Sequence, residues 1–152
     1  MAKAKLDHGT WVLVCDGAKA LFFENVGDAH DPKLETREVA EQPDLKDREM
    51  KQAPSGRVFA SVGRRRGAVE ETDFHDRSER EFLRQVSRKL DAQIGARHIR
   101  HLIVAAPSRA LGMLRGELSP AARNVISAEI DKDYVKMPAY EIEKHLTKAL
   151  AG

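Results

Sequence analysis

The residues best suited to binding chemistry are three consecutive arginines. Arg64, Arg65 and Arg66 lie between Gly63 and Gly67. Guanidinium groups donate hydrogen bonds in a planar fork that matches phosphate oxygens, and neighbouring positive charges repel one another unless an anion binds. A phosphate backbone would satisfy all three, with an affinity that falls steeply as salt rises. The cluster therefore predicts binding to a polyanion such as RNA.

A second set of arginines lies further along the chain. Arg77, Arg80, Arg84 and Arg88 are three or four residues apart, the spacing that places side chains on one face of a helix. Like charges at this spacing are mildly unfavourable in an isolated helix. We expect both sets to form one basic surface, and the predicted RNA-binding residues are Arg57, Gly63, Arg64, Arg65, Arg66, Gly67, Arg77, Arg80, Arg84 and Arg88.

Acidic residues near both sets support another interpretation. Glu70, Glu71 and the acids of residues 41–50 could pair with the consecutive arginines, while Glu79 and Glu81 dilute the charge of the helical set. In that case the arginines belong to a solvated loop and a solvated helix face. The formal net charge is only +2, so overall charge does not decide between the two interpretations.

An alternative function is metal-dependent nucleic-acid hydrolysis. Asp16 comes after an apolar run and precedes Gly17, where ribonuclease-H-like nucleases place a metal-binding carboxylate. Two-metal hydrolysis needs several convergent acids. Residues 99–106 contribute none, so the set would be Asp16 with Glu129, Asp131 or Asp133. We expect Asp16 to form a turn instead.

The remaining reactive residue types predict no catalytic residue, metal site or cofactor. His98 and His101 precede or enter an expected strand, where a spacing of three directs side chains to opposite faces. Cys15, the single cysteine, adjoins an apolar run and is expected to be a buried thiol. The chain has no nucleophile elbow, phosphate-binding glycine loop or dinucleotide fingerprint.

Short apolar runs predict an antiparallel meander in the first part of the chain. Thr10 to Val14 is typical of a strand buried on both faces, and Ala20 to Phe23 comes after a turn signal at Asp16 and Gly17. Leu34 to Val39 alternates as a third strand with one wet face. Residues 41–72 have no persistent period and predict a long flexible basic loop.

Helical spacing dominates the second half of the chain. Asp76 to Ile94 is predicted to be a long helix, with a capping box formed by Asp76 and Glu79 and a stop at Gly95. Ile99 to Ala106 predicts a buried strand and a parallel crossover. The expected later elements are a short helix capped by Ser108, a connector at Pro120 to Val125, an edge strand at Ile126 to Ile130 and a final helix opened by Pro138.

This order favours a single α/β domain over residues 1–152. Three strands, a long helix, and then alternating strands and helices suit a mixed sheet with helices on its faces, as in the ribonuclease-H-like group. No apolar stretch approaches the ~20 residues that cross a bilayer. Without a signal-peptide pattern or a second cysteine, the sequence predicts a cytoplasmic protein. The sequence does not predict its oligomeric state.

Several short motifs together resemble a bacterial family described as required for attachment to host cells. They are residues 11–14 with 16–18, residues 21–25, Gly56-Arg57-Val58-Phe59, residues 102–107, residues 111–115 and residues 131–133. The family is similar to the middle domain of archaeal and eukaryotic class-1 peptide-chain release factors. In those factors a Gly-Gly-Gln tripeptide promotes peptidyl-tRNA hydrolysis. Here Gly63 to Gly67 occupies the corresponding place without a glutamine.

The resemblance therefore implies binding and not hydrolysis. We expect a non-enzymatic RNA- or ribosome-associated protein that affects attachment indirectly. The alternatives are the nuclease and a protein-interaction module in which residues 41–72 become ordered on contact with a partner.

Overall fold

A computed structural model describes residues 4–42 and 64–151, with side chains of the longest helix described from Phe74 onward. Its sheet has the strand order β3-β2-β1-β4-β5. The strands are β1 (Trp11–Cys15), β2 (Lys19–Asn25), β3 (Leu34–Glu41), β4 (Leu102–Ala106) and β5 (Ile126–Asp131). The helices are α2 (Arg64–Gly95), α3 (Ser108–Glu117), α4 (Pro120–Val125) and α5 (Ala139–Ala151).

The sheet is mixed, as the sequence predicted. β2 pairs antiparallel with both β1 and β3, which confirms the meander. β4 pairs parallel with β1, which confirms the crossover, and β5 pairs parallel with β4 at the sheet edge. The strand order and directions are those of a ribonuclease-H-like α/β fold. The carboxyl ends of β1, β4 and β5 consequently lie at one end of the sheet.

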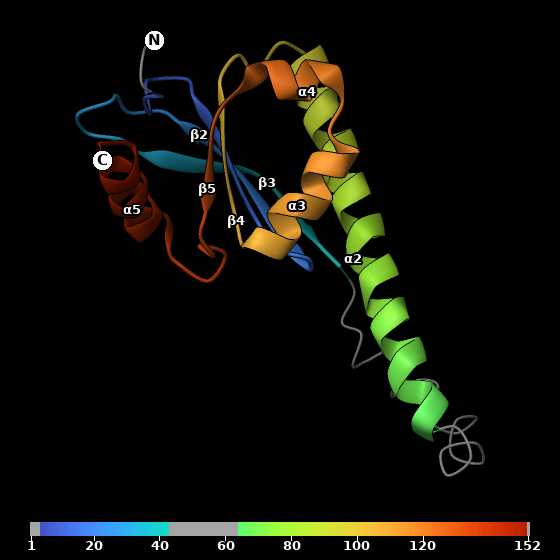
Figure 1. Cartoon of the computed structure of the whole chain (residues 1–152). Coiled ribbons are helices and arrows are strands. Elements are labelled where there is room, and N and C mark those ends of the chain that lie inside the picture. The colour runs from blue at the N-terminus through green and yellow to red at the C-terminus, as the bar shows by residue number, and fades with distance from the viewer. Residues whose placement is uncertain (1–3, 43–63, 152) are drawn as a thin grey trace.

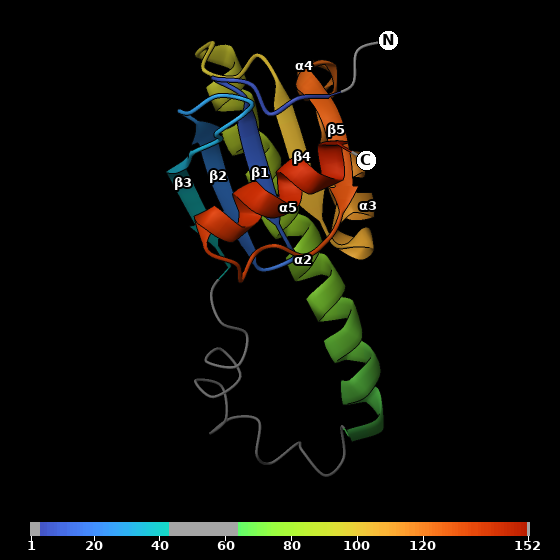
Figure 2. The same cartoon turned by 90° about the vertical axis from the view of Figure 1, so that its left-hand side faces the viewer.

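Helices cover both faces of the sheet (Figures 1 and 2). α5 crosses one face, while α2, α3 and α4 lie on the other. Every residue of β1 and β4 is buried, so their side chains alternate between two hydrophobic clusters. This continuous burial explains why both strands are uninterrupted apolar runs.

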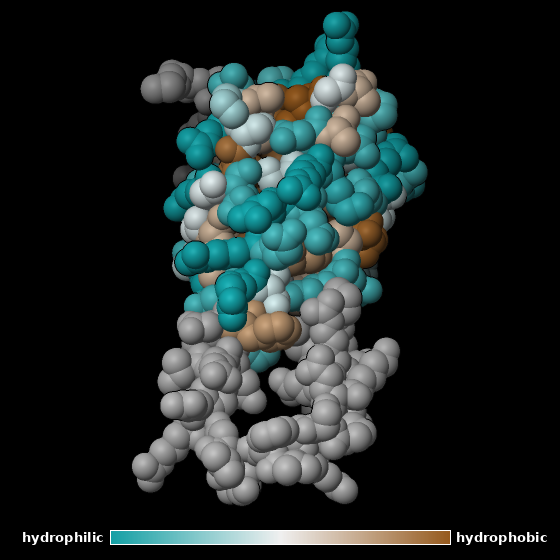
Figure 3. Space-filling view, turned by 90° about the vertical axis from the view of Figure 1, so that its right-hand side faces the viewer, coloured by the Kyte–Doolittle hydropathy of each residue, from teal (hydrophilic) through white to brown (hydrophobic). Residues whose placement is uncertain are grey.

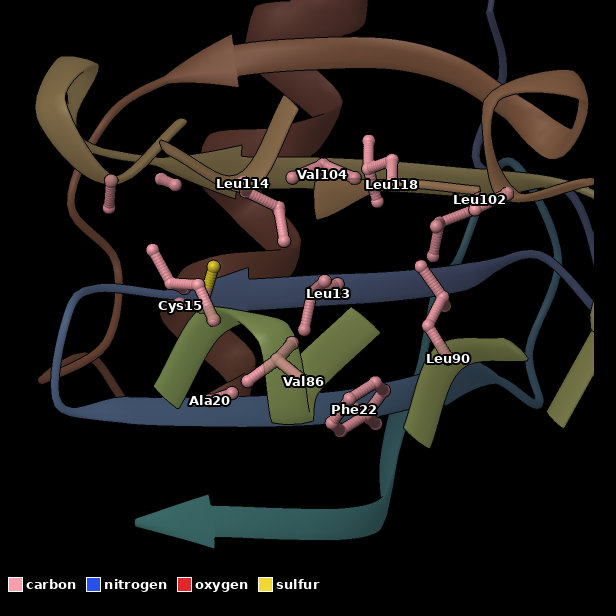
Figure 4. Packing of buried hydrophobic residues seen from close by; sticks show 14 of the residues in the cluster. Leu13, Cys15, Ala20, Phe22, Val86, Leu90, Leu102, Val104, Leu114 and Leu118 are labelled. Carbon is pink, nitrogen blue, oxygen red and sulfur yellow. The ribbon is translucent and has the colours of Figure 1, made fainter. Parts of the chain in front are cut away.

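The larger cluster joins the sheet to α2. Figure 4 shows Leu13 of β1 and Val86 of α2 pointing toward one another, and both side chains are fully buried. Leu83 and Leu90 belong to the same cluster. They have the helical spacing from which the helix was predicted. α2 is therefore part of the core over its second half.

The turn between β2 and β3 depends on Asn25, which is fully buried. Its side-chain amide donates to the Leu6 carbonyl at 2.7 Å, and its oxygen accepts from the backbone N–H groups of Gly27 and Lys33 at 3.0 and 2.8 Å. A Cβ atom added at Gly27 would lie 2.3 Å from the Asp31 carbonyl oxygen. This close backbone approach requires glycine.

The start of α2 differs from the prediction. The helix begins at Arg64, twelve residues before Asp76, so residues 64–72 are helical and not irregular, while residue 41 belongs to β3. Asp76 and Glu79 do not form a capping box, because both lie inside the helix, and Arg109 of α3 binds both carboxylates. Residues 43–63, including the extended piece expected at residues 57–61, lie outside the described residues.

The end of α2 also differs in detail. The helix ends at Gly95, as predicted, but the left-handed residue is Arg97, with φ of 65°. The His98 N–H donates to the Gln93 carbonyl at 3.0 Å, and the Arg97 N–H donates to the Ile94 carbonyl at 2.9 Å. This is a Schellman motif, a position where glycine is the usual residue. Arg97 therefore ends the helix at a conformational cost.

The last four elements agree closely with expectation. α4 and the edge strand β5 have the predicted positions, and Ile142 and Leu146 of α5 are fully buried. The predicted Ser108 cap is wrong: Pro107 is the N-cap residue of α3, and the Ser108 hydroxyl donates to Asp131 at 2.5 Å. Within residues 4–42 and 64–151, no helix has the length and apolar character that a membrane span requires.

Candidate nucleic-acid interface

α2 consists of two differently packed halves. The core half, residues 82–95, includes Phe82, Leu83, Val86 and Leu90, all buried. The arm half, residues 64–81, has no buried side chain among its described residues 74–81. Figures 1 and 2 show the arm half extending beyond the end of the sheet. The described side chains of the arm half, residues 74–81, are therefore not part of the hydrophobic core.

The four arginines predicted to share a helix face do so. Arg77, Arg80, Arg84 and Arg88 are all exposed, and their spacing places them on one side of α2. We call this set the arginine face. In Figure 3 the side of the molecule that carries α2 is mostly hydrophilic, with apolar residues confined to small patches. A linear anion could therefore approach this side without displacing any part of the core.

The members of the arginine face differ in their partners. Arg84 bonds to Glu81 at 3.1 Å and to Glu117 at 3.2 Å. The Glu117 hydrogen bond and charge raise the pKa of Arg84 above its usual value. Arg80 and Arg88 have no ion pair within the described part of the chain. Two guanidinium groups on this face are thus available to a phosphate.

For the other predicted RNA-binding residues, the structure describes the backbone of some and nothing of the rest. Arg57 and Gly63 lie outside the described residues. Arg64, Arg65, Arg66 and Gly67 form the first turn of α2 and not a glycine-flanked loop. Successive positions on an α-helix are about 100° apart around its axis. The three arginine positions are therefore distributed around the helix, and only position 66 falls in line with the arginine face.

Arg109 joins α3 to the arm half of α2. Its guanidinium bonds to Asp76 and also to Glu79, with an Nε–Oε2 distance of 3.2 Å. All three side chains are partly exposed, so the ion pairs are accessible to salt. We call these three residues the arm clamp. Sequence reasoning missed it, because Arg109 lies 30 positions after Glu79 and 33 positions after Asp76.

The carboxylates of the nuclease alternative are each in other contacts. Asp16 accepts from the N–H groups of Ala18 and Lys19, both at 2.8 Å, so it forms the expected turn. Glu129 bonds to Arg115 at 2.7 Å, and Asp131 accepts from Ser108. The described residues contain no group of three or more His, Cys, Asp or Glu side chains that could hold a metal.

An acid that the nuclease set omitted, Glu79, lies against the turn between β1 and β2. A Cβ atom added at Gly17 would lie 2.8 Å from Cγ and Cδ of Glu79, so this side chain covers the β1–β2 turn. Its carboxylate is bound by Arg109. Glu79 thus joins the arm half to the β1–β2 turn, and the nuclease alternative gains no support from this contact.

The histidine and cysteine predictions were tested in part. His98 is exposed and bonds through Nδ1 to Gln93 at 2.7 Å, and His101 is also exposed. Cys15 is fully buried, and Figure 4 shows its sulfur among hydrocarbon side chains. Burial, with a smaller contribution from the Asp16 charge, raises the pKa of the Cys15 thiol to about 12. The expectation of a buried, unreactive thiol agrees with this environment.

Two surface grooves were also missed. The larger has a volume of about 380 Å³ and lies between the end of β3 and α2; it is lined by Gln42, Phe74, Arg77, Ser78, Glu81, Phe82 and Gln85. The smaller, about 280 Å³, lies between α3, α4 and β5 and is lined by Arg115, Leu118, Arg123, Ile126 and Glu129. The only sequence signal for the larger groove is Phe74, an aromatic residue within a polar stretch.

Fold and surface together define a ribonuclease-H-like α/β protein with an arginine-faced helix. Its sequence matches the family model described as "protein required for attachment to host cells" over residues 11–146. The chain belongs to this family, and the resemblance noted in its sequence motifs is confirmed. No curated protein matches it.

Among solved structures, an archaeal translation termination factor, aRF1, is similar in fold. The sequence identity is 12%, the TM-score is 0.48, and the match covers 94% of this chain and 38% of that chain. The chain thus spans little more than a third of the factor's length.

Proposed function

We propose that this protein is a non-enzymatic RNA-binding protein, associated with free RNA or with the ribosome, and that the arginine face of α2 is its RNA surface. The observation that carries the proposal is the exposure of four arginines along one side of a helix whose first half extends beyond the sheet. Guanidinium groups in a row match the repeating phosphates of a nucleic-acid backbone.

The pattern of ion pairs among the described residues favours RNA binding by these arginines over a purely structural role. Arg84 helps to fasten α2 to α3 through Glu117, so part of its role is structural. Arg80 and Arg88 have no acidic partner in the described structure. Leaving charged side chains at this spacing without acids is mildly unfavourable. An anionic ligand supplies the missing charge.

A role in RNA binding also fits the family description without requiring contact with a host cell. Binding to messenger RNA or to the ribosome would change the amounts of other proteins, including those that attach cells to a host. In this proposal the effect on attachment is indirect.

The test is an equilibrium titration of fluorescent single-stranded RNA across a range of salt concentrations. The variant Arg80→Ala/Arg88→Ala removes two exposed charges that have no acidic partner in the described structure. We expect affinity to fall roughly tenfold at moderate salt, and the slope of log K against log salt to become shallower by roughly 1.4.

The matched control is Lys144→Ala/Lys148→Ala. These lysines are exposed on α5, on the opposite face of the sheet, and either double variant lowers the formal net charge from +2 to 0. The control should bind RNA as the unmodified chain does. Equal losses in both variants would mean that net charge alone drives binding, and an unchanged arginine variant would contradict the proposed surface.

A further inference from the structure

The larger groove adjoins the arginine face. Gln42 at the end of β3 forms one side, and the other lining residues belong to α2. Phe74, Ser78, Glu81 and Gln85 are three or four residues apart, so they lie along one side of the helix. Arg77 belongs both to the groove and to the arginine face. A strand of RNA on that face would therefore pass the groove.

The groove has an aromatic residue that the core does not use. Phe74 is 42% exposed, whereas Phe82, two turns later and also in the groove lining, is 4% exposed. The Phe74 ring makes an edge-to-face contact with His75, at 6.2 Å between ring centroids. An exposed aromatic face beside a cationic surface is the usual platform on which unpaired bases stack.

The polar lining of the groove offers both donors and acceptors. The amides of Gln42 and Gln85 and the hydroxyl of Ser78 make no side-chain hydrogen bond within the described residues. Glu81 adds a carboxylate, which bonds to Arg84. Amides bond to base edges as donor and acceptor together, and carboxylates accept from the N–H groups of bases. An apolar peptide side chain would leave these groups unpaired.

Size is consistent with a small aromatic ligand. The groove volume of about 380 Å³ falls in the lower part of the range for small-molecule sites, roughly 300–1,000 Å³. It suits one base with part of its sugar and is too small for a duplex.

We propose that this groove binds one unpaired base of RNA, which stacks on Phe74 while Gln42 and Gln85 bond to its edge. The inference rests on the proposed function and makes it more specific, because it assigns the protein a preference for single strands. Paired bases cannot enter the groove, since their edges and faces are already occupied in the duplex. The arginine face then supplies affinity for either form, and the groove discriminates between them.

The test compares binding of single-stranded RNA with binding of a duplex of the same length at one salt concentration. Phe74→Ala should lose roughly tenfold in affinity for the single strand, because stacking on an aromatic residue is removed. Its affinity for the duplex and its salt slope should not change. Phe74→Trp should restore the preference for the single strand.

The matched control is Tyr140→Ala. Tyr140 is an aromatic residue that is 59% exposed on α5, on the other face of the sheet, so its removal should leave both affinities unchanged. A Phe74→Ala variant that keeps its preference while Arg80→Ala/Arg88→Ala loses affinity overturns the base site but leaves the proposed function intact. If neither variant loses affinity, both are overturned.

The Phe74→Trp variant also distinguishes RNA from a protein ligand. Its indole fluorescence should be quenched by a short single-stranded oligonucleotide, while the only native tryptophan, Trp11, is buried and should not respond. Quenching by a leucine-rich amphipathic peptide, with none by the oligonucleotide, would overturn the inference in favour of a peptide groove.

Discussion

The two halves of α2 have opposite relations to the rest of the protein. Side chains of the core half fill the space above the sheet, and Leu83, Val86 and Leu90 are fully buried. The described side chains of the arm half are all at least partly exposed. The contacts of the arm half with the body include the arm clamp and the contact of Glu79 with Gly17.

This difference shows how one helix can serve both stability and binding. Burial of apolar side chains fixes the direction of the core half, and the helix backbone carries that direction into the arm half. The arginine face begins on the arm half and continues over the outer side of the core half. Its arginines are therefore positioned by a core to which they do not contribute.

The largest expected difference is in thiol reactivity, between the arm half and Cys15 of β1, which belongs to the same hydrophobic cluster as the core half. Alkylation requires a thiolate, and Cys15 is buried with its thiol pKa raised to about 12. A cysteine introduced by Arg80→Cys lies on the exposed arm half. At pH 8 its alkylation should be at least about a thousandfold faster than that of Cys15, because a much larger fraction of an ordinary cysteine is thiolate at this pH. Mass spectrometry of the two peptides measures both rates. Similar rates would mean that the β1 core opens readily.

Truncation of one side chain in each half should differ strongly in its effect on stability. Leu83→Ala leaves a cavity in the core and should lower the free energy of unfolding by about 2–5 kcal/mol. Phe74→Ala removes a ring that is already 42% exposed and should cost less than about 1 kcal/mol. Urea denaturation measures both values. Comparable losses would show that the arm half is packed after all.

Loss of the arm clamp should have a smaller effect. Arg109→Ala breaks two partly exposed ion pairs, so we expect a loss of about 0.5–1 kcal/mol that disappears in high salt. Hydrogen exchange should accelerate in residues 74–81 and remain unchanged in residues 82–95. The control is Arg100→Ala, which removes an exposed arginine outside the clamp. Uniform acceleration along α2 would contradict the division into two halves.

The smallest expected effect concerns the end of the core half. Arg97→Gly places at the left-handed position, with φ of 65°, the residue that adopts it without steric cost. We expect stabilisation of roughly 0.5 kcal/mol in thermal or urea denaturation, because relief of strain exceeds the added entropy of the unfolded chain. Arg97→Ala keeps the strain and should not stabilise the protein.

The fold was largely predictable because its signals are local. β1 and β4 are uninterrupted apolar runs, and the core half of α2 has a clear helical period. The start of α2 was not predictable in this way. Asp76 and Glu79 have the spacing of a capping box, but their carboxylates are bound by Arg109, a tertiary contact. Gly63 and Gly67 likewise suggested a loop where the helix already begins at Arg64.

The candidate interface was predictable to a similar degree. The arginine face results from spacing alone, since residues three and four apart must share a helix side. The groove could not be predicted from spacing, because Gln42 at the end of β3 forms it together with residues of α2 that come more than thirty positions later. Ion pairing is equally hidden: Arg84 and Arg88 look alike in sequence, yet only Arg84 reaches Glu117.

The most direct test of the arginine face is ultraviolet cross-linking of the unmodified protein to single-stranded RNA, with identification of the cross-linked peptides. We predict cross-links within residues 74–88 of α2 and their loss in Arg80→Ala/Arg88→Ala, with Lys144→Ala/Lys148→Ala unaffected. Cross-links confined to α4, β5 or α5, or persisting in the arginine variant, would contradict the account.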